Sequence, residues 1–175
     1  MPYVGFGLSL FLLVGLWQAR DRFHRFGLDA VAWNSTSGAI TTRAIVLGAA
    51  AGLAVAACFV DSSTGELPRW PEVWVGVAFG PLVEELIFRG YLYRAAEWAL
   101  AARIAHPGRV AAIVVAAVFA LSHLAKGGIT TPQLASIFLT GVLFGVLRQT
   151  SGSTVPPYLA HASYNAVIYA AACLR

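Results

Sequence analysis

Six apolar segments divide this chain, and they restrict it to a fold that lipid rather than water surrounds. The segments are Tyr3–Trp17, Ile40–Val60, Trp70–Leu100, Val110–Leu124, Pro132–Leu147 and Pro156–Leu174. A helix that crosses a bilayer needs about 20 apolar residues, and the shorter segments fit if they tilt or if the bilayer thins locally. Because backbone groups in lipid must bond internally, we expect an all-α fold: a polytopic membrane helix bundle of about six transmembrane segments.

The composition supports a membrane protein. Only 11% of the 175 residues are charged and 58% are hydrophobic, whereas a soluble domain carries about 25% charged residues. The formal charge of +4 comes mostly from arginines in loops, without the basic and aromatic stripe of a nucleic-acid-binding surface. We therefore predict a single membrane domain over residues 1–175, with the lipid bilayer as a partner and no nucleic acid.

The loops differ in charge, and this difference predicts an orientation. The loops after the first and third segments are basic, whereas the loop over residues 61–72 is acidic; the basic side chains are Arg20, Arg22, Arg25, Arg43, Arg103 and Arg109. The positive-inside rule places the basic loops in the cytoplasm. The arginine-rich and alanine-rich composition is typical of a GC-rich bacterial genome, so we expect an integral protein of the bacterial inner (plasma) membrane.

Two adjacent carboxylates, Glu84 and Glu85, interrupt the third apolar segment. A charge near the bilayer centre costs about 2.5–3.5 kcal/mol on insertion scales, so such residues usually mark function. On a helix, Glu85 precedes Arg89 by four residues, the order that favours an ion pair, and Glu84 points about 100° away. We expect Arg89 to neutralise Glu85 and Glu84 to face a cavity as a general base. The alternative is a structural Glu–Arg network that joins helices.

Polar side chains recur at a similar depth in two other segments. His123 lies near the end of the fourth segment, while His161 and Asn165 are four residues apart and share a face of the last one. Taken singly, each histidine is also explained as a residue that caps a helix end or bonds a carbonyl. At 1.5 Å of rise per residue, the depths of Glu84 and the two histidines agree to within about 10 Å. We expect tilted helices to bring them into one site.

Other hydrolytic chemistries lack their motifs. The sequence contains no HExxH metalloprotease motif and no GxSxG nucleophile elbow. Glu84, His123 and His161 form a set that can bind zinc with an open coordination position. Nothing in their spacing requires a metal, so both alternatives stay open on the residues alone.

These residues resemble the motifs of the CPBP intramembrane proteases, the family that includes the CAAX prenyl endopeptidases. In order, the motifs read Glu84-Glu85-Leu86-Ile87-Phe88-Arg89, Phe119-Ala120-Leu121-Ser122-His123 and His161-Ala162-Ser163-Tyr164-Asn165, with a looser element from Phe138 through Gly141 to Gly145. Each motif alone is weak, but three in order in a polytopic chain are specific. The resemblance covers about residues 75–170. It implies a catalytic core over about 70–175, preceded by two leading spans and a basic loop over 1–69.

The resemblance implies an intramembrane endopeptidase that cleaves near the C-terminal tail of a membrane-anchored protein, either a prenylated CAAX-like tail or a sorting tail. In the implied site, Glu84 and His123 activate water. His161 and Asn165 polarise the carbonyl and hold the oxyanion. Glu85 and Arg89 support these four residues. The family is described both as glutamate-type and as metal-dependent. We favour the glutamate type, which needs no cofactor; a zinc ion, if bound, would take Glu84, His123 and His161.

Two other functions stay open at this point. The same resemblance extends to bacteriocin self-immunity factors, so a non-catalytic membrane immunity or binding protein is the main alternative. Intramembrane glutamates and histidines also mark transporters and proton relays, although this chain shows no internal repeat of the kind that transporters have.

Overall fold

All regular structure in the described residues, 2–25, 29, 32–59 and 70–174 of this computed structural model, is helical. The first two helices are α1 (Pro2–His24) and α2 (Gly38–Phe59). A long helix follows, made of α3 (Trp70–Trp74), α4 (Gly80–Glu85) and α5 (Tyr93–Leu100). Two π-helical turns connect these parts: η2 (Val75–Phe79) joins α3 to α4, and η3 (Leu86–Leu92) joins α4 to α5. The last helices are α6 (Pro107–Ser122), extended by a 3-10 turn (His123–Lys126), α7 (Thr131–Ser151) and α8 (Val155–Cys173).

The predicted all-α fold is confirmed, and each apolar segment corresponds to one helix, with Val60 outside the described residues. The first helix runs past the predicted end at Trp17 to His24, because its polar last turns still favour a helix. Within the described residues, three helices can cross a membrane by length and composition: Gly38–Phe59, Pro107–Ala125 and Thr131–Ser151. The total of six spans stays a prediction, as does the cytoplasmic placement of the basic loops.

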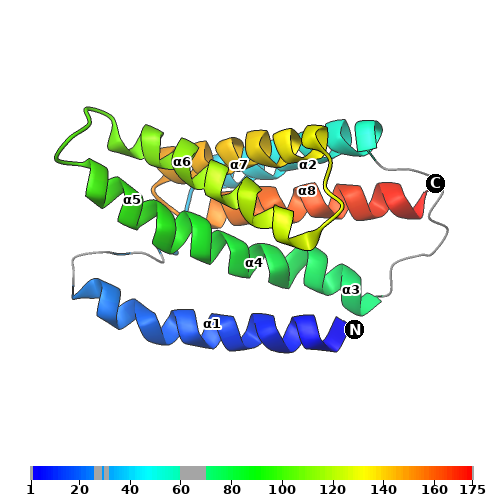
Figure 1. Cartoon of the computed structure of the whole chain (residues 1–175), viewed down its shortest axis with the longest axis horizontal. Coiled ribbons are helices and arrows are strands. Elements are labelled where there is room, and N and C mark those ends of the chain that lie inside the picture. Colours follow the sequence, from blue (N-terminus) through cyan, green and yellow to red (C-terminus); the bar gives the residue numbers. More distant parts are fainter. Residues whose placement is uncertain (1, 26–28, 30–31, 60–69, 175) are drawn as a thin grey trace.

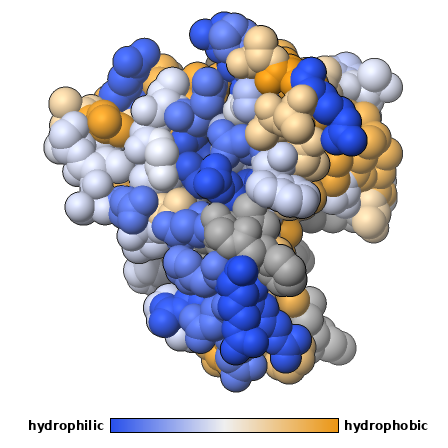
Figure 2. Space-filling view, turned by 90° about the vertical axis from the view of Figure 1, so that its left-hand side faces the viewer, coloured by the Kyte–Doolittle hydropathy of each residue, from blue (hydrophilic) through white to orange (hydrophobic). Residues whose placement is uncertain are grey.

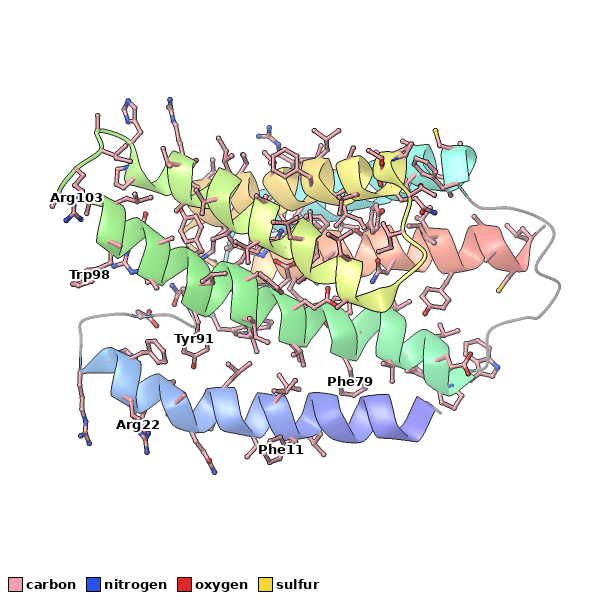
Figure 3. All side chains as sticks on the ribbon, in the orientation of Figure 1. Phe11, Arg22, Phe79, Tyr91, Trp98 and Arg103 are labelled. Carbon is pink, nitrogen blue, oxygen red and sulfur yellow. The ribbon has the colours of Figure 1, made fainter. Side chains whose placement is uncertain are left out.

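The helices lie side by side along the long axis of the molecule, with α1 against the α3–α5 helix (Figure 1). Figure 2 shows hydrophilic side chains gathered at the end where α1 ends and α6 begins. Arg22 and Arg103, from two loops that the sequence predicts to share one side of the membrane, both lie at this end (Figure 3). Tyr91 projects from the long helix toward α1, and its hydroxyl donates to the carbonyl of Leu16.

Helix boundaries have local causes. The α7 helix begins with a capping box, in which the Thr130 side chain accepts from the backbone of Gln133 and the Gln133 side chain accepts in return. It ends at Gly152, whose φ of 67° is a left-handed conformation that glycine adopts without strain. Both α6 and α8 carry proline in the first turn, where a missing N–H costs no intrahelical bond.

Small residues allow α2 to pack closely on α8. Every fourth residue of α2 is small and buried: Ala44, Gly48, Gly52 and Ala56. A Cβ added at Gly48 would collide with the carbonyl oxygen of Ala160, and one at Gly52 would lie 2.7 Å from that of Tyr164. This contact supports the part of α8 that carries His161 and Asn165.

Gly141 and Gly145, which belong to the looser motif element, allow close packing between α7 and α6. A Cβ at Gly141 would lie 3.2 Å from the Cβ of Ala116, and one at Gly145 would lie 2.9 Å from that of Ala112. Without side chains at these two positions, the backbones approach closely enough for van der Waals contact along their length.

Candidate active site

Glu84 and Glu85 lie in α4, the short α-helical stretch between the π-helical turns η2 and η3. π-helical turns inside longer helices often coincide with functional sites. The two neighbouring side chains point to different surroundings: that of Glu85 is fully buried, whereas that of Glu84 is 30% exposed. Adjacent residues of one helix therefore reach two separate environments, as predicted.

Glu85 is the centre of a buried ionic network. Its Oε1 accepts from Arg89 Nη1 at 3.0 Å, which confirms the predicted ion pair, and lies 2.8 Å from His161 Nδ1. Arg89 Nη2 donates to the carbonyl of Gly141 at 2.9 Å. These bonds offset the desolvation that makes a buried ion pair costly. The other carboxylate oxygen, Oε2, is buried and has no hydrogen-bond partner within the described residues.

Glu84 faces a cavity of about 410 Å³ inside the bundle. His123, His161 and Asn165 line the same cavity, so the structure brings together the four predicted catalytic residues from α4, the α6–3-10 junction and α8. His161 Nε2 lies 3.8 Å from Glu84 Oε2. The predicted convergence of three helices on one site is therefore present in the structure.

Both imidazoles are held through Nδ1. Glu85 is paired with Arg89 and accepts, so His161 donates from Nδ1 and directs Nε2 toward Glu84. His123 Nδ1 lies 2.9 Å from the carbonyl oxygen of Phe119, which can only accept. Each Nδ1 contact sets the orientation of its ring and so the direction of Nε2. His123 thus also has the helix-capping contact that the sequence offered as an alternative.

Asn165 is fixed by the first π-helical turn. Its Nδ2 donates to the carbonyl of Gly76 in η2 at 2.7 Å. A side-chain amide has two N–H donors, so this bond sets the orientation of the group and uses one of them. The second N–H is the donor that a substrate could engage.

The sequence did not indicate several residues that line this cavity. Thr140, Tyr164 and Tyr169 contribute to its wall, and a Cβ at Gly76 would collide with the Tyr169 phenol. Tyr164 immediately precedes Asn165 within the third motif, and this position could have predicted that it lies near the site. Nothing in the sequence predicts the same of Gly76 and Tyr169, because both lie in apolar segments and meet only after folding.

The donor chemistry of the site suits a metal, but its geometry does not form a ligand set. Metal-binding histidines usually hold their second nitrogen in a hydrogen bond to a carboxylate or a carbonyl, as His161 and His123 do. Within the part of the chain that the structure describes, however, no three His, Cys, Asp or Glu side chains are arranged to hold one ion.

A larger cavity of about 830 Å³ lies between α1 and the long helix. Leu13 and Trp17 of α1 face Leu86 and Tyr91 across it. None of the predicted site residues lines it, so the predicted site lies in the smaller cavity.

A family model described as Type II CAAX prenyl endopeptidase Rce1-like matches residues 65–167. This range covers more than half of the chain and contains every predicted site residue. The chain belongs to this Rce1-like family. The predicted resemblance to CAAX endopeptidases is therefore confirmed, and membership supports a CAAX-type intramembrane endopeptidase with a protein substrate. No curated protein and no solved structure matches the Rce1-like chain.

Proposed function

We propose that this Rce1-like protein hydrolyses a peptide bond near the C-terminal tail of a membrane-anchored protein, using a water molecule that Glu84 and His123 activate. The observation that supports this most directly is the cavity that Glu84, His123, His161 and Asn165 line within an apolar bundle. A base, an imidazole and an amide donor around one space of about 410 Å³ are the groups that amide hydrolysis requires.

In the first step, the oxygen of water attacks the scissile carbonyl carbon and the Glu84 carboxylate takes the proton. Glu84 is the candidate base because Arg89 engages its neighbour Glu85, and because its own side chain is partly exposed to the cavity. The ring of His123, whose Nδ1 is held by the Phe119 carbonyl, accepts a hydrogen bond from the same water at Nε2. The product of this step is a tetrahedral intermediate with a negatively charged oxygen.

His161 and Asn165 stabilise that oxygen. A protonated His161 donates from Nδ1 to Glu85 and from Nε2 into the cavity, with Glu85 and Arg89 holding the ring in place. Asn165 supplies its second N–H, since Gly76 holds the first. Preorganised donors of this kind contribute about 2.7–4 kcal/mol each when they are removed by mutation.

In the second step, the bond between the carbonyl carbon and nitrogen breaks. The proton held by Glu84 passes to the departing nitrogen, which leaves as an amine. The other product is a new carboxylic acid, which becomes a carboxylate by losing its proton to water. Glu84 returns to its starting state, so no external reductant, oxidant or nucleotide is required.

The family description points to a CAAX-type tail as the substrate, and a sorting tail of a membrane protein is the second substrate class. We propose the bacterial inner membrane as the location. Comparison of the C-termini of membrane proteins between a deletion strain and its parent would identify the natural substrate.

The test uses the full chain in lipid nanodiscs and membrane-inserted peptides that end in a farnesylated CAAX tail, with unprenylated peptides for comparison. The wild type should cleave at least one set, and Glu84→Gln should not. Glu97→Gln, a change of the same kind at an α5 residue that pairs with Arg94 outside the cavity, should cleave like the wild type. Cleavage by Glu84→Gln at the wild-type rate would overturn the mechanism, and toxin protection that survives this change would indicate an immunity protein instead.

A further inference from the structure

Arg148 is a buried cation that the proposed reaction does not use. It lies in the last turn of α7 and is 6% exposed. Its Nε donates to the backbone carbonyl of Arg89 at 2.9 Å, between residues 59 positions apart. The guanidinium carbon also lies 5.1 Å from the centre of the Tyr93 ring. A buried charge is expensive, so this contact needs a physical reason.

The π-helical turn η3 supplies that reason. In a regular α-helix, the N–H of Tyr93 would bond the carbonyl of Arg89, four residues earlier. In this structure it bonds the carbonyls of Gly90 and Phe88 instead. The Arg89 carbonyl therefore does not receive the α-helical hydrogen bond from Tyr93. Arg148 provides a charged donor for this carbonyl.

The α7 helix thus holds Arg89 at two points. Arg148 holds its backbone, while the carbonyl of Gly141 holds its side chain at Nη2. From there the contacts continue through Arg89 Nη1 to Glu85 Oε1 and from the same oxygen to His161 Nδ1. Each link is a hydrogen bond of 2.8–3.0 Å between groups that are almost fully buried.

We propose that Arg148 is a positioning residue, which fixes the η3 turn so that Arg89 keeps Glu85 in the place that orients the His161 ring. Arg148 does not line the cavity, and its hydrogen bond goes to the Arg89 carbonyl, so it acts through Arg89. The effect on cleavage rests on the function proposed above, whereas the effect on the His161 ring does not.

The experiment compares Arg148→Gln and Arg148→Lys with the wild type in nanodiscs, with Arg109→Gln as the control. Arg109 is an exposed arginine in the first turn of α6, so its removal matches the loss of charge without touching η3. The first measurement is ¹⁵N NMR of histidine-labelled protein, with the His161 signals assigned from their loss in His161→Gln. The second is kcat and KM for the cleaved peptide.

In Arg148→Gln, we expect the His161 ring-nitrogen signals to shift, because the hydrogen bond from Nδ1 to Glu85 is no longer held in place, with the His123 signals unchanged. The kcat value should fall about 10- to 100-fold, the usual effect of losing a partner that orients a catalytic or ligating group, while KM stays within about twofold. Arg148→Lys keeps a charged donor without the planar fork, and should be intermediate in both measurements. Arg109→Gln should match the wild type.

Unchanged His161 signals in both Arg148 variants would overturn the proposal, as would a lower melting temperature with a normal kcat for the folded fraction. If Arg148→Gln does not fold, Arg148→Lys decides: shifted His161 signals support the positioning role, and wild-type signals refute it. If the wild type itself cleaves nothing, the proposed function fails, and the NMR result still decides the role of Arg148.

Discussion

Glu85 and His161, 76 residues apart in the sequence, are joined by a buried hydrogen bond of 2.8 Å between Oε1 and Nδ1. This bond ties α4 to α8 and turns the Nε2 edge of the His161 ring toward Glu84. It also assigns different tasks to two adjacent glutamates. Glu85 holds α4 to α8, whereas Glu84 lines the cavity.

Removing one partner of the buried Glu85–Arg89 pair should destabilise the protein more than removing both. Glu85→Gln should destabilise the folded protein by about 3–5 kcal/mol, because the Arg89 charge then loses the carboxylate that it hydrogen-bonds. The double change to Glu85→Gln with Arg89→Met should recover much of this loss while remaining inactive. Thermal unfolding in nanodiscs measures both.

The exposed pair of Arg94 and Glu97 is the control for that cycle. It is also an ion pair within one helix, but its side chains are 38% and 26% exposed, so removing it should cost about 0–1 kcal/mol. A double variant of the buried pair that is no more stable than Glu85→Gln would contradict the ionic explanation.

Asn165 should contribute to the rate more than to substrate binding. Asn165→Ala removes the N–H donor proposed for the oxyanion, so we expect kcat to fall about 10²- to 10³-fold with KM little changed. Steady-state kinetics with the cleaved peptide separate the two constants. A rise in KM at unchanged kcat would assign Asn165 to substrate binding, and Gln149→Ala, at an exposed position of α7, should have neither effect.

The contact between α2 and α8 should be intolerant of a single methyl group. Gly48→Ala places a Cβ against the carbonyl oxygen of Ala160, next to His161, so we expect a destabilisation of about 1–3 kcal/mol and a parallel loss of activity. Gly15→Ala is the matched control, because a Cβ there meets nothing within 4 Å. It should leave stability unchanged or raise it by about 0.5–1 kcal/mol, since alanine favours a helix. Equal melting temperatures for both variants would contradict the packing account.

Chelation should leave cleavage intact, because the proposed base is Glu84 itself. After dialysis against EDTA or 1,10-phenanthroline, we expect kcat to stay within about twofold of the untreated protein. Loss of activity that zinc restores would instead identify Glu84, His123 and His161 as metal ligands.

The sequence indicated the parts of the fold and site that depend on short spacings. Glu85 and Arg89, or His161 and Asn165, share a helix face because they are four residues apart, and any helix would place them so. The apolar segments likewise marked the helices to within a few residues, except where polar residues extended α1 beyond Trp17.

The contacts between distant residues could not be foreseen in this way. The bonds from Arg148 to Arg89 and from Asn165 to Gly76 depend on π-helical turns that displace carbonyls from the regular helical pattern. No residue pattern in an apolar segment predicts a π-helical turn. Arg148 follows directly after the predicted end of its segment at Leu147, whereas the fold continues α7 past it and buries it.

Single-turnover cleavage in ¹⁸O-labelled water tests the central claim most directly, namely that Glu84 activates a water molecule for peptide hydrolysis within the membrane. Mass spectrometry of the product should find one ¹⁸O atom in the new C-terminal carboxylate for the wild type, and no product for Glu84→Gln. Product formed by Glu84→Gln at the wild-type rate, or wild-type product that lacks the label, would contradict it.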